Sequence, residues 1–173
     1  ILAARSVAPA LAAGNAVVLK PSEFTSVSSL IFGRLASSAG LPVGALQVIT
    51  GTGPEAGAAL TEHPKVRRLA FTGSVRAGRE VARRAAERLI PVSLELGGKS
   101  PNIVFADADL EAAIPAAVRA FTTNTGQACW SGTRLLVERS IHDDVVAGVL
   151  AHASTLRPRQ DLGPLITEAQ YEK

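Results

Sequence analysis

Short apolar runs rich in β-branched residues alternate along the chain with longer segments whose apolar residues recur every three or four positions. The short runs predict strands, and the longer segments predict helices between them. Strands are expected at residues 16–19, 45–49, 66–71, 91–96, 102–105 and 135–137. Helices are expected at residues 26–39, 55–62, 74–89, 110–123 and 143–156, the fourth capped by Asp109. This alternation favours an α/β fold built on a parallel, doubly wound sheet.

Two adjacent glycines, Gly97 and Gly98, follow the fourth predicted strand and supply a flexible or sharply turned joint. We place a domain boundary there, between residues 1–97 and residues 98–173, where a second α/β unit begins. Both ends of the sequence resemble interior segments. The chain opens on the apolar spacing of a helix, contains no Met, and ends within a helix predicted to begin after Pro164. We therefore expect an internal piece of a longer protein.

The composition argues against several classes of protein. The formal net charge of +3 is spread over 173 residues without a block of like sign, which argues against a nucleic-acid-binding tail. Arg5, Pro9 and the Gly-Asn pair at 14–15 interrupt the apolar opening, so no membrane span or export signal is expected. The single cysteine excludes an intrachain disulfide and fits a reducing compartment, for which the cytoplasm is the expectation.

The densest basic stretch lies on the helix predicted at residues 74–89. We interpret its arginines as a solvated face rather than a phosphate-binding surface, because they lie opposite apolar positions and no aromatic residues are interleaved. The arginines are Arg76, Arg79, Arg83, Arg84 and Arg88, and the apolar positions are Val75, Gly78, Ala82, Ala85 and Leu89.

Four polar or glycine-rich segments follow predicted strands, where the ligand crevice of an open parallel sheet lies. These segments are KPSE at 20–23, GTGPEAG at 51–57, GSVRAG at 73–78 and ELGGK at 95–99. Lys20 and Glu23 form either a surface salt bridge or contacts with a ribose, where Glu23 would repel a 2′-phosphate. Gly73 and Ser74 form either a tight, capped turn or a phosphate site at a helix N-terminus. The second segment lacks the spacing of the Rossmann fingerprint.

Cys129 follows the polar segment NTGQA at 124–128. A lone cysteine is usually a small buried hydrophobic residue, but its polar, glycine-containing setting also suits a nucleophile. A nucleophilic thiol needs a neighbouring base or positive dipole, and Glu95 is a candidate base. No metal site is expected, because the histidines have no ligand spacing with one another or with the cysteine. They are His63, His142 and His152.

Five motifs are present in one order: GNAVVLKPSE at 14–23, TGTGPEAG at 50–57, FTGS at 71–74, LELGGKSPNIVF at 94–105 and GQAC at 126–129. Together they resemble the aldehyde dehydrogenase superfamily, in its order and spacing, over nearly all of the chain. The resemblance implies an enzyme that oxidises a small-molecule aldehyde to a carboxylic acid with NAD(P), and full-length relatives that are homo-oligomeric.

The resemblance also implies roles for the two reactive side chains. In that family a cysteine thiolate attacks the aldehyde carbonyl, and a hydride then leaves the thiohemiacetal for the nicotinamide. A glutamate activates the water that hydrolyses the resulting thioester. Cys129 and Glu95, 34 positions apart, stand at these places. The Cys129 backbone N–H would form half of the oxyanion hole.

The resemblance implies a set of cofactor-binding residues as well: Lys20, Glu23, Gly53, Gly57, Gly73, Ser74 and Leu96. The lysine and glutamate would contact the adenosine ribose, residues 73–74 the pyrophosphate and the leucine the nicotinamide, while the glycines at 53 and 57 would let a helix approach the cofactor. NAD is favoured over NADP because of Glu23. Residues 1–97 then correspond to part of an NAD(P)-binding domain, and residues 98–173 to part of the catalytic domain.

Several parts of the family pattern are expected outside this sequence. These are a Pro-Trp-Asn segment that supplies the second oxyanion donor, a later glutamate motif that positions the nicotinamide ribose, and a β-strand arm used for oligomerisation. The alternative interpretation is therefore a truncated, non-catalytic remnant that binds nucleotide.

Overall fold

The computed structural model describes residues 2–172 and divides the chain into two compact units, separated in sequence between Glu95 and Leu96. This division lies two residues before the boundary predicted at the glycine pair. The assignment of cofactor binding to the first unit and of the nucleophile to the second stays a prediction from the sequence.

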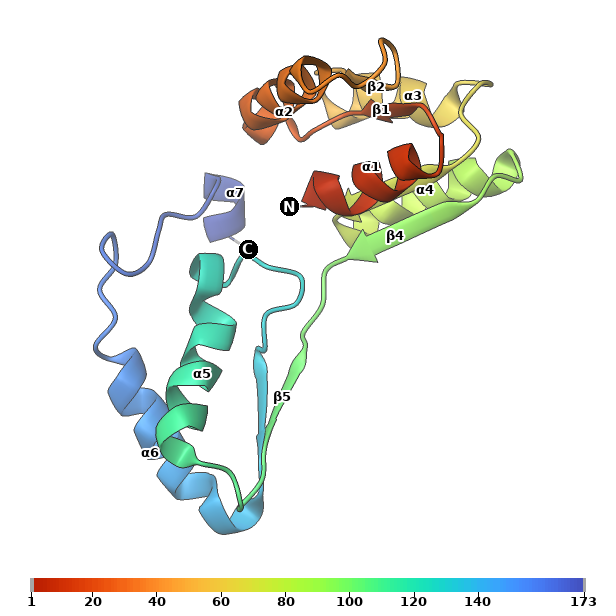
Figure 1. The fold of residues 1–173 in the computed structure, drawn as a ribbon. Helices are drawn as coiled ribbons and strands as arrows, with labels where there is room; N and C mark the ends of the chain where they lie inside the picture. Colours follow the sequence, from red (N-terminus) through yellow and green to blue (C-terminus); the bar gives the residue numbers. More distant parts are fainter. Residues whose placement is uncertain (1, 173) are drawn as a thin grey trace. The chain divides into compact units, whose positions relative to one another are not determined.

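The first unit alternates helices and strands in the predicted order (Figure 1). Its elements are α1 (Leu2–Ala12), β1 (Val17–Leu19), η1 (Glu23–Thr25), α2 (Ser26–Ser38), β2 (Leu46–Val48), η2 (Gly53–Gly57), α3 (Ala58–Glu62), β3 (Leu69–Gly73), α4 (Val75–Glu87) and β4 (Val92–Leu96). β1 and β2 are parallel, with Leu19 opposite Val48, and α2 forms the crossover between them. β3 pairs with β4. The core includes the buried side chains of Val7, Leu69 and Ala85.

The second unit repeats the strand and helix alternation. Its elements are β5 (Pro101–Val104), α5 (Leu110–Thr122), η3 (Thr123–Gly126), β6 (Arg134–Val137), η4 (Arg139–Ile141), α6 (His142–Ala153) and α7 (Glu168–Tyr171). β5 and β6 are parallel, and α5 packs against both β5 and α6 (Figure 1). Val104, Val118 and Val145 are buried between these elements, whereas Ile103 and Leu136 on the alternate strand positions are exposed. The predicted α/β fold class is confirmed, and the described strands pair two by two.

The last helix differs from the prediction. Instead of beginning after Pro164, α7 begins at Glu168, where the Thr167 hydroxyl accepts a hydrogen bond from the Gln170 N–H at 3.3 Å. The preceding residues are held elsewhere, since the Ile166 N–H donates to the side chain of Gln127 at 3.0 Å. A tertiary contact therefore keeps residues 164–166 out of the helix. Lys173, where the predicted helix ends, lies outside the described residues.

The prediction of a fully solvated arginine face on α4 is wrong for two arginines. Arg84 and Arg88 are half-buried and contact α3 and the segment that follows it, whereas Arg76, Arg79 and Arg83 are exposed as expected. The opposite, apolar face is also shorter than predicted. Gly78 and Ala85 are buried, but Leu89 is 92% exposed, because its backbone is left-handed (φ 53°) and ends the helix.

Acid sensitivity should arise at Glu80. Hydrogen bonds from Arg83 and then Arg84 lower the pKa of this carboxylate from 4.5 to about 2. Because the folded-state pKa is depressed, the stabilisation is present above pH 4.5 and is lost as pH falls from there towards 2. We expect Glu80→Gln to flatten the pH dependence of unfolding in that window, measured by urea titration at several pH values. Equal pH dependence in the two proteins would contradict this account.

None of the helices among the described residues is both long and apolar enough to cross a membrane.

Candidate active site

The carboxyl ends of β1 and β2 lie at one edge of their pair, because the strands are parallel. Lys20 follows β1 and the 51–57 segment follows β2. The Lys20 side chain is only 13% exposed, and its Nζ lies 3.7 Å from Oε2 of Glu23. A Cβ added to Gly57 would lie 3.9 Å from Cδ of Lys20. The structure thus brings together three predicted cofactor residues, and the salt bridge named as the alternative for Lys20 and Glu23 is also present.

The glycines of the 51–57 segment differ in what surrounds them. Gly51 has φ 142°, and an added Cβ would lie 2.7 Å from Cβ of Ala56, so glycine is required there. Gly53 is exposed, and an added Cβ would meet no atom within 4 Å. Between them, the Thr52 hydroxyl accepts from the Glu55 N–H at 3.3 Å and donates to its carboxylate at 2.8 Å. A capped turn therefore leaves open space around Gly53.

Replacing Gly51 by alanine should destabilise the chain by about 1–3 kcal/mol, because the new methyl meets Ala56 and the backbone is strained. Gly53→Ala is the matched control, expected to change the free energy of unfolding by less than about 0.5 kcal/mol. Urea unfolding measures both. Equal losses in the two variants would contradict the distinct roles given to these glycines.

Gly73 and Ser74 connect β3 to α4. A Cβ added to Gly73 would lie 2.6 Å from the Phe71 ring, and the Ser74 hydroxyl accepts from the Ala77 N–H at 3.2 Å. The tight, capped turn is therefore present. It also sets the N-terminus of a 13-residue helix beside two exposed residues, where main-chain N–H groups and the helix dipole favour an anion.

Glu95 and Leu96 are the last two residues of β4. Leu96 is half-buried and Glu95 is exposed. Oε1 of Glu95 lies 3.7 Å from Nη2 of Arg5 on α1, with both side chains 57% exposed. Such an exposed pair contributes little to stability. Arg5 is not among the residues predicted for this site, although it is a charged residue within the apolar sequence of α1.

Cys129 is a free, half-buried thiol on the loop between α5 and β6. The loop leaves α5 through consecutive left-handed residues: Asn124 (φ 54°), Thr125 (φ 57°) and Gly126 (φ 72°). A Cβ added to Gly98 would lie 3.1 Å from the carbonyl oxygen of Cys129, so the glycine joint passes directly against the cysteine backbone. The predicted meeting of Cys129 with Glu95 stays a prediction, because these residues belong to different units.

Gln127 is a residue whose role the sequence analysis missed. Its Nε2 donates to the carbonyls of Asn124 at 3.3 Å and Pro164 at 3.4 Å, and its Oε1 accepts from the Ile166 N–H. The Thr125 hydroxyl adds a hydrogen bond to the Gly163 carbonyl at 3.0 Å. These bonds fix the cysteine loop to the 163–166 segment. In the sequence, the position of Gln127 two residues before Cys129 is the one feature that points to a role near the thiol.

No group of three or more His, Cys, Asp or Glu side chains within residues 2–172 is arranged to hold a metal ion. The reactive groups that the predicted catalytic residues offer are a thiol, at Cys129, and a carboxylate, at Glu95.

Comparison with known proteins finds similarity to aldehyde dehydrogenases. The model of the "Aldehyde dehydrogenase family" matches residues 1–173. A probable betaine aldehyde dehydrogenase from Schizosaccharomyces pombe is 48% identical over 171 residues, which cover 95% of this chain and 34% of that protein.

Two solved structures are similar as well. The crystal structure of an NAD-dependent aldehyde dehydrogenase from Sinorhizobium meliloti has a TM-score of 0.95 and 44% identity, covering 99% of this chain and 35% of that one. A cysteine-to-alanine mutant of aldehyde dehydrogenase C from Pseudomonas syringae, in complex with NAD+ and octanal, has a TM-score of 0.89 and 44% identity, covering 96% and 36%. The chain spans about a third of the length of these relatives, and it belongs to the aldehyde dehydrogenase family.

Proposed function

We propose that this chain carries the cofactor-binding and thiol segments of an enzyme that oxidises an aldehyde to a carboxylic acid with NAD. Cys129 acts as the nucleophile and Glu95 as the base. The contact of Gly98 with the Cys129 carbonyl carries this proposal. Only Leu96 and Gly97 separate Glu95 from Gly98, so the covalent chain keeps the Cα atoms of Glu95 and Gly98 within about 11 Å of each other.

The residues of the first unit fit a dinucleotide. Lys20 offers an ammonium group and Glu23 a carboxylate acceptor at the strand edge, matching the hydroxyls of a ribose. The open space at Gly53 allows close approach of a ligand to the backbone. The N-terminus of α4 at Ser74 favours a pyrophosphate. Glu23 disfavours a 2′-phosphate by charge repulsion, so NAD is proposed over NADP, and Leu96 would lie against the nicotinamide.

The reaction divides into two steps carried by different side chains. The Cys129 thiolate attacks the carbonyl carbon and forms a C–S bond, and its own backbone N–H donates to the resulting oxyanion. Bound NAD would supply the acceptor for a hydride from that carbon, and Cys129 would then carry the acyl group as a thioester. Glu95 then takes a proton from water as the hydroxide attacks the thioester. The C–S bond breaks, the acid leaves, the thiolate returns, and Glu95 releases its proton to solvent.

A second candidate, a non-catalytic remnant that binds nucleotide, is favoured by the exposed apolar face of Ile103 and Leu136. Large apolar side chains left in water on a sheet face indicate that the second unit is incomplete as a folded layer. On this alternative the chain binds nucleotide through Lys20 and Glu23 and performs no chemistry at Cys129.

The two candidates are separated by adding NAD+ and a panel of aliphatic and aromatic aldehydes to the chain and following NADH absorbance. Aldehyde-dependent NADH formation supports the proposed enzyme. Binding of NADH, seen by fluorescence, without formation of NADH supports the remnant and overturns catalysis by this chain itself. We further propose that the whole enzyme is cytoplasmic and homo-oligomeric. Imaging of a tagged protein tests its location, and light scattering tests its assembly.

A further inference from the structure

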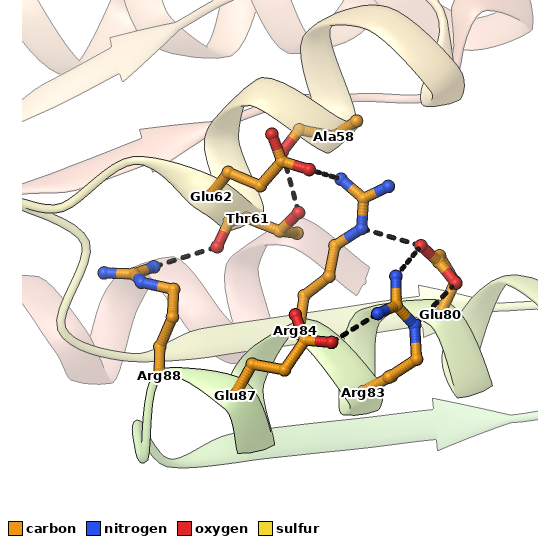
Figure 2. Close-up of polar contacts among 8 residues, drawn as sticks. All are labelled: Ala58, Thr61, Glu62, Glu80, Arg83, Arg84, Glu87 and Arg88. Atoms are coloured by element: carbon orange, nitrogen blue, oxygen red, sulfur yellow. Dashed lines mark hydrogen bonds and ion pairs between the residues drawn. The ribbon is translucent and has the colours of Figure 1, made fainter.

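Arg84 of α4 and Arg88, the C-cap residue directly after α4, contact residues outside that helix (Figure 2). The Arg84 side chain is 19% exposed; its Nη1 contacts the Glu62 carboxylate of α3, and its Nε donates to Glu80 at 2.7 Å. The Arg88 guanidinium donates to the carbonyls of Thr61 and Val66, each at 2.8 Å. Both arginines therefore join α4 to α3 and to the segment after it.

Arg83, next to Arg84 in sequence, makes contacts of another kind. Its guanidinium pairs with Glu80 and Glu87, and both carboxylates belong to α4 itself. The side chain is 57% exposed. This arginine supports its own helix and provides an internal reference for the other two.

Because α3 is short, it needs contacts with other elements to stay helical. α3 has five residues, and helices below about 12 residues are marginal in water unless packing holds them. Its last carbonyl groups have no partner within the helix, and Arg88 supplies two N–H donors for one of them and for Val66 beyond. Thr61 is buried, and its hydroxyl donates to the Ala58 carbonyl at 2.8 Å. The C-terminal end of α3 is thus fixed to α4.

The N-terminal ends of both helices lead to the proposed cofactor segments. α3 continues directly from η2 (Gly53–Gly57), and α4 begins directly after Ser74. The contacts that Arg84 and Arg88 make with α3 and with Val66 are called the clamp here. The clamp fixes the position of the 53–57 turn relative to the Gly73–Ser74 turn. An exposed ion pair contributes little by itself, but the clamp includes a half-buried Arg84 and two charge-assisted bonds from Arg88 to the main chain.

We propose that Arg84 and Arg88 are positioning residues for the nucleotide: they hold α3 on α4 and thereby keep the 53–57 turn in the conformation that binds the cofactor. The proposal rests on the proposed function, because it assumes that the 53–57 and 73–74 turns bind NAD.

The test measures NADH affinity by fluorescence titration, together with hydrogen exchange of the backbone amides at residues 53–62. We expect Arg88→Ala to speed exchange in that segment and to weaken NADH binding about tenfold, equivalent to about 1.4 kcal/mol. Arg88→Lys, which keeps the charge and part of the donor set, should restore part of the affinity. Glu62→Gln changes a side chain that is 62% exposed and should weaken binding roughly threefold through loss of the Arg84 pair.

Arg83→Ala is the matched control, because it removes an arginine of α4 that holds no part of α3; exchange and NADH affinity should stay unchanged. The inference is overturned if Arg88→Ala and Glu62→Gln speed exchange at 53–62 while NADH affinity is unchanged, or if Arg83→Ala weakens binding equally. If the wild-type chain binds no NADH, the proposed function fails and this inference with it. Faster exchange in Arg88→Ala would then still establish the clamp itself, so the two failures are distinguishable.

Discussion

Cys129→Ala should reduce aldehyde-dependent NADH formation to the uncatalysed background, a loss of roughly 10⁴-fold or more. The reason is chemical: the alanine methyl cannot form the C–S bond from which hydride departs. The sequence contains one cysteine, so no second thiol in the chain can take over. The measurement is NADH absorbance with wild type and variant at equal concentration.

The fold and the nucleotide site should survive this change. Cys129 lies in the second unit, and the proposed nucleotide residues from Lys20 to Ser74 lie in the first. NADH affinity should therefore be equal in the two proteins, which separates loss of chemistry from loss of binding. Persistent turnover in Cys129→Ala would exclude the thiol as the nucleophile.

Glu95→Gln should allow hydride transfer and block hydrolysis of the thioester. The amide cannot take a proton from water, so the thioester on Cys129 persists after hydride has left. We expect one equivalent of NADH to form rapidly and the steady-state rate to fall by about 10²–10⁴-fold, the range expected for loss of a general base. Rapid-mixing absorbance measures both phases.

Glu87→Gln is a suitable control for the loss of a carboxylate, because Glu87 is exposed on α4 and forms its ion pair with Arg83. Its turnover should equal that of wild type. If Glu95→Gln showed no initial NADH formation at all, Glu95 would be needed before hydride departure, and its assignment to thioester hydrolysis would be wrong.

The local features of this fold were predictable because short-range signals determine them. Ser74 and Asp109 precede apolar helical periodicity, and each caps its helix as expected. The apolar run at 45–49 predicted β2, which pairs in parallel with β1. The grouping of Lys20 and Glu23 beside the 51–57 segment followed from the rule that parallel strands end at a common edge.

Features that depend on distant partners were not predictable in the same way. Arg84 and Arg88 match the helical pattern of solvated arginines, yet their partners lie 22 and 27 residues away. The Ile166 N–H that binds Gln127 lies 39 residues from it and displaces the start of α7. Periodicity carries no information about such pairs, because each side of the contact has an ordinary local pattern.

The same limit applies to the reactive pair. Cys129 and Glu95 were selected by residue type, setting and the motifs around them, and the resemblance supplied their roles. The structure adds the contact of Gly98 with the Cys129 carbonyl, a close approach that a side chain at position 98 would disturb. Neither the spacing nor the composition of the ELGGK segment indicated that contact.

The central claim, that Cys129 carries the acyl group and Glu95 releases it, is tested most directly by mass spectrometry of the Glu95→Gln chain after reaction with an aldehyde and NAD+. The account predicts one acyl group per chain, located on the peptide that contains Cys129 and absent when NAD+ is omitted. An acyl group on another residue, or no adduct although NADH has formed, would contradict it.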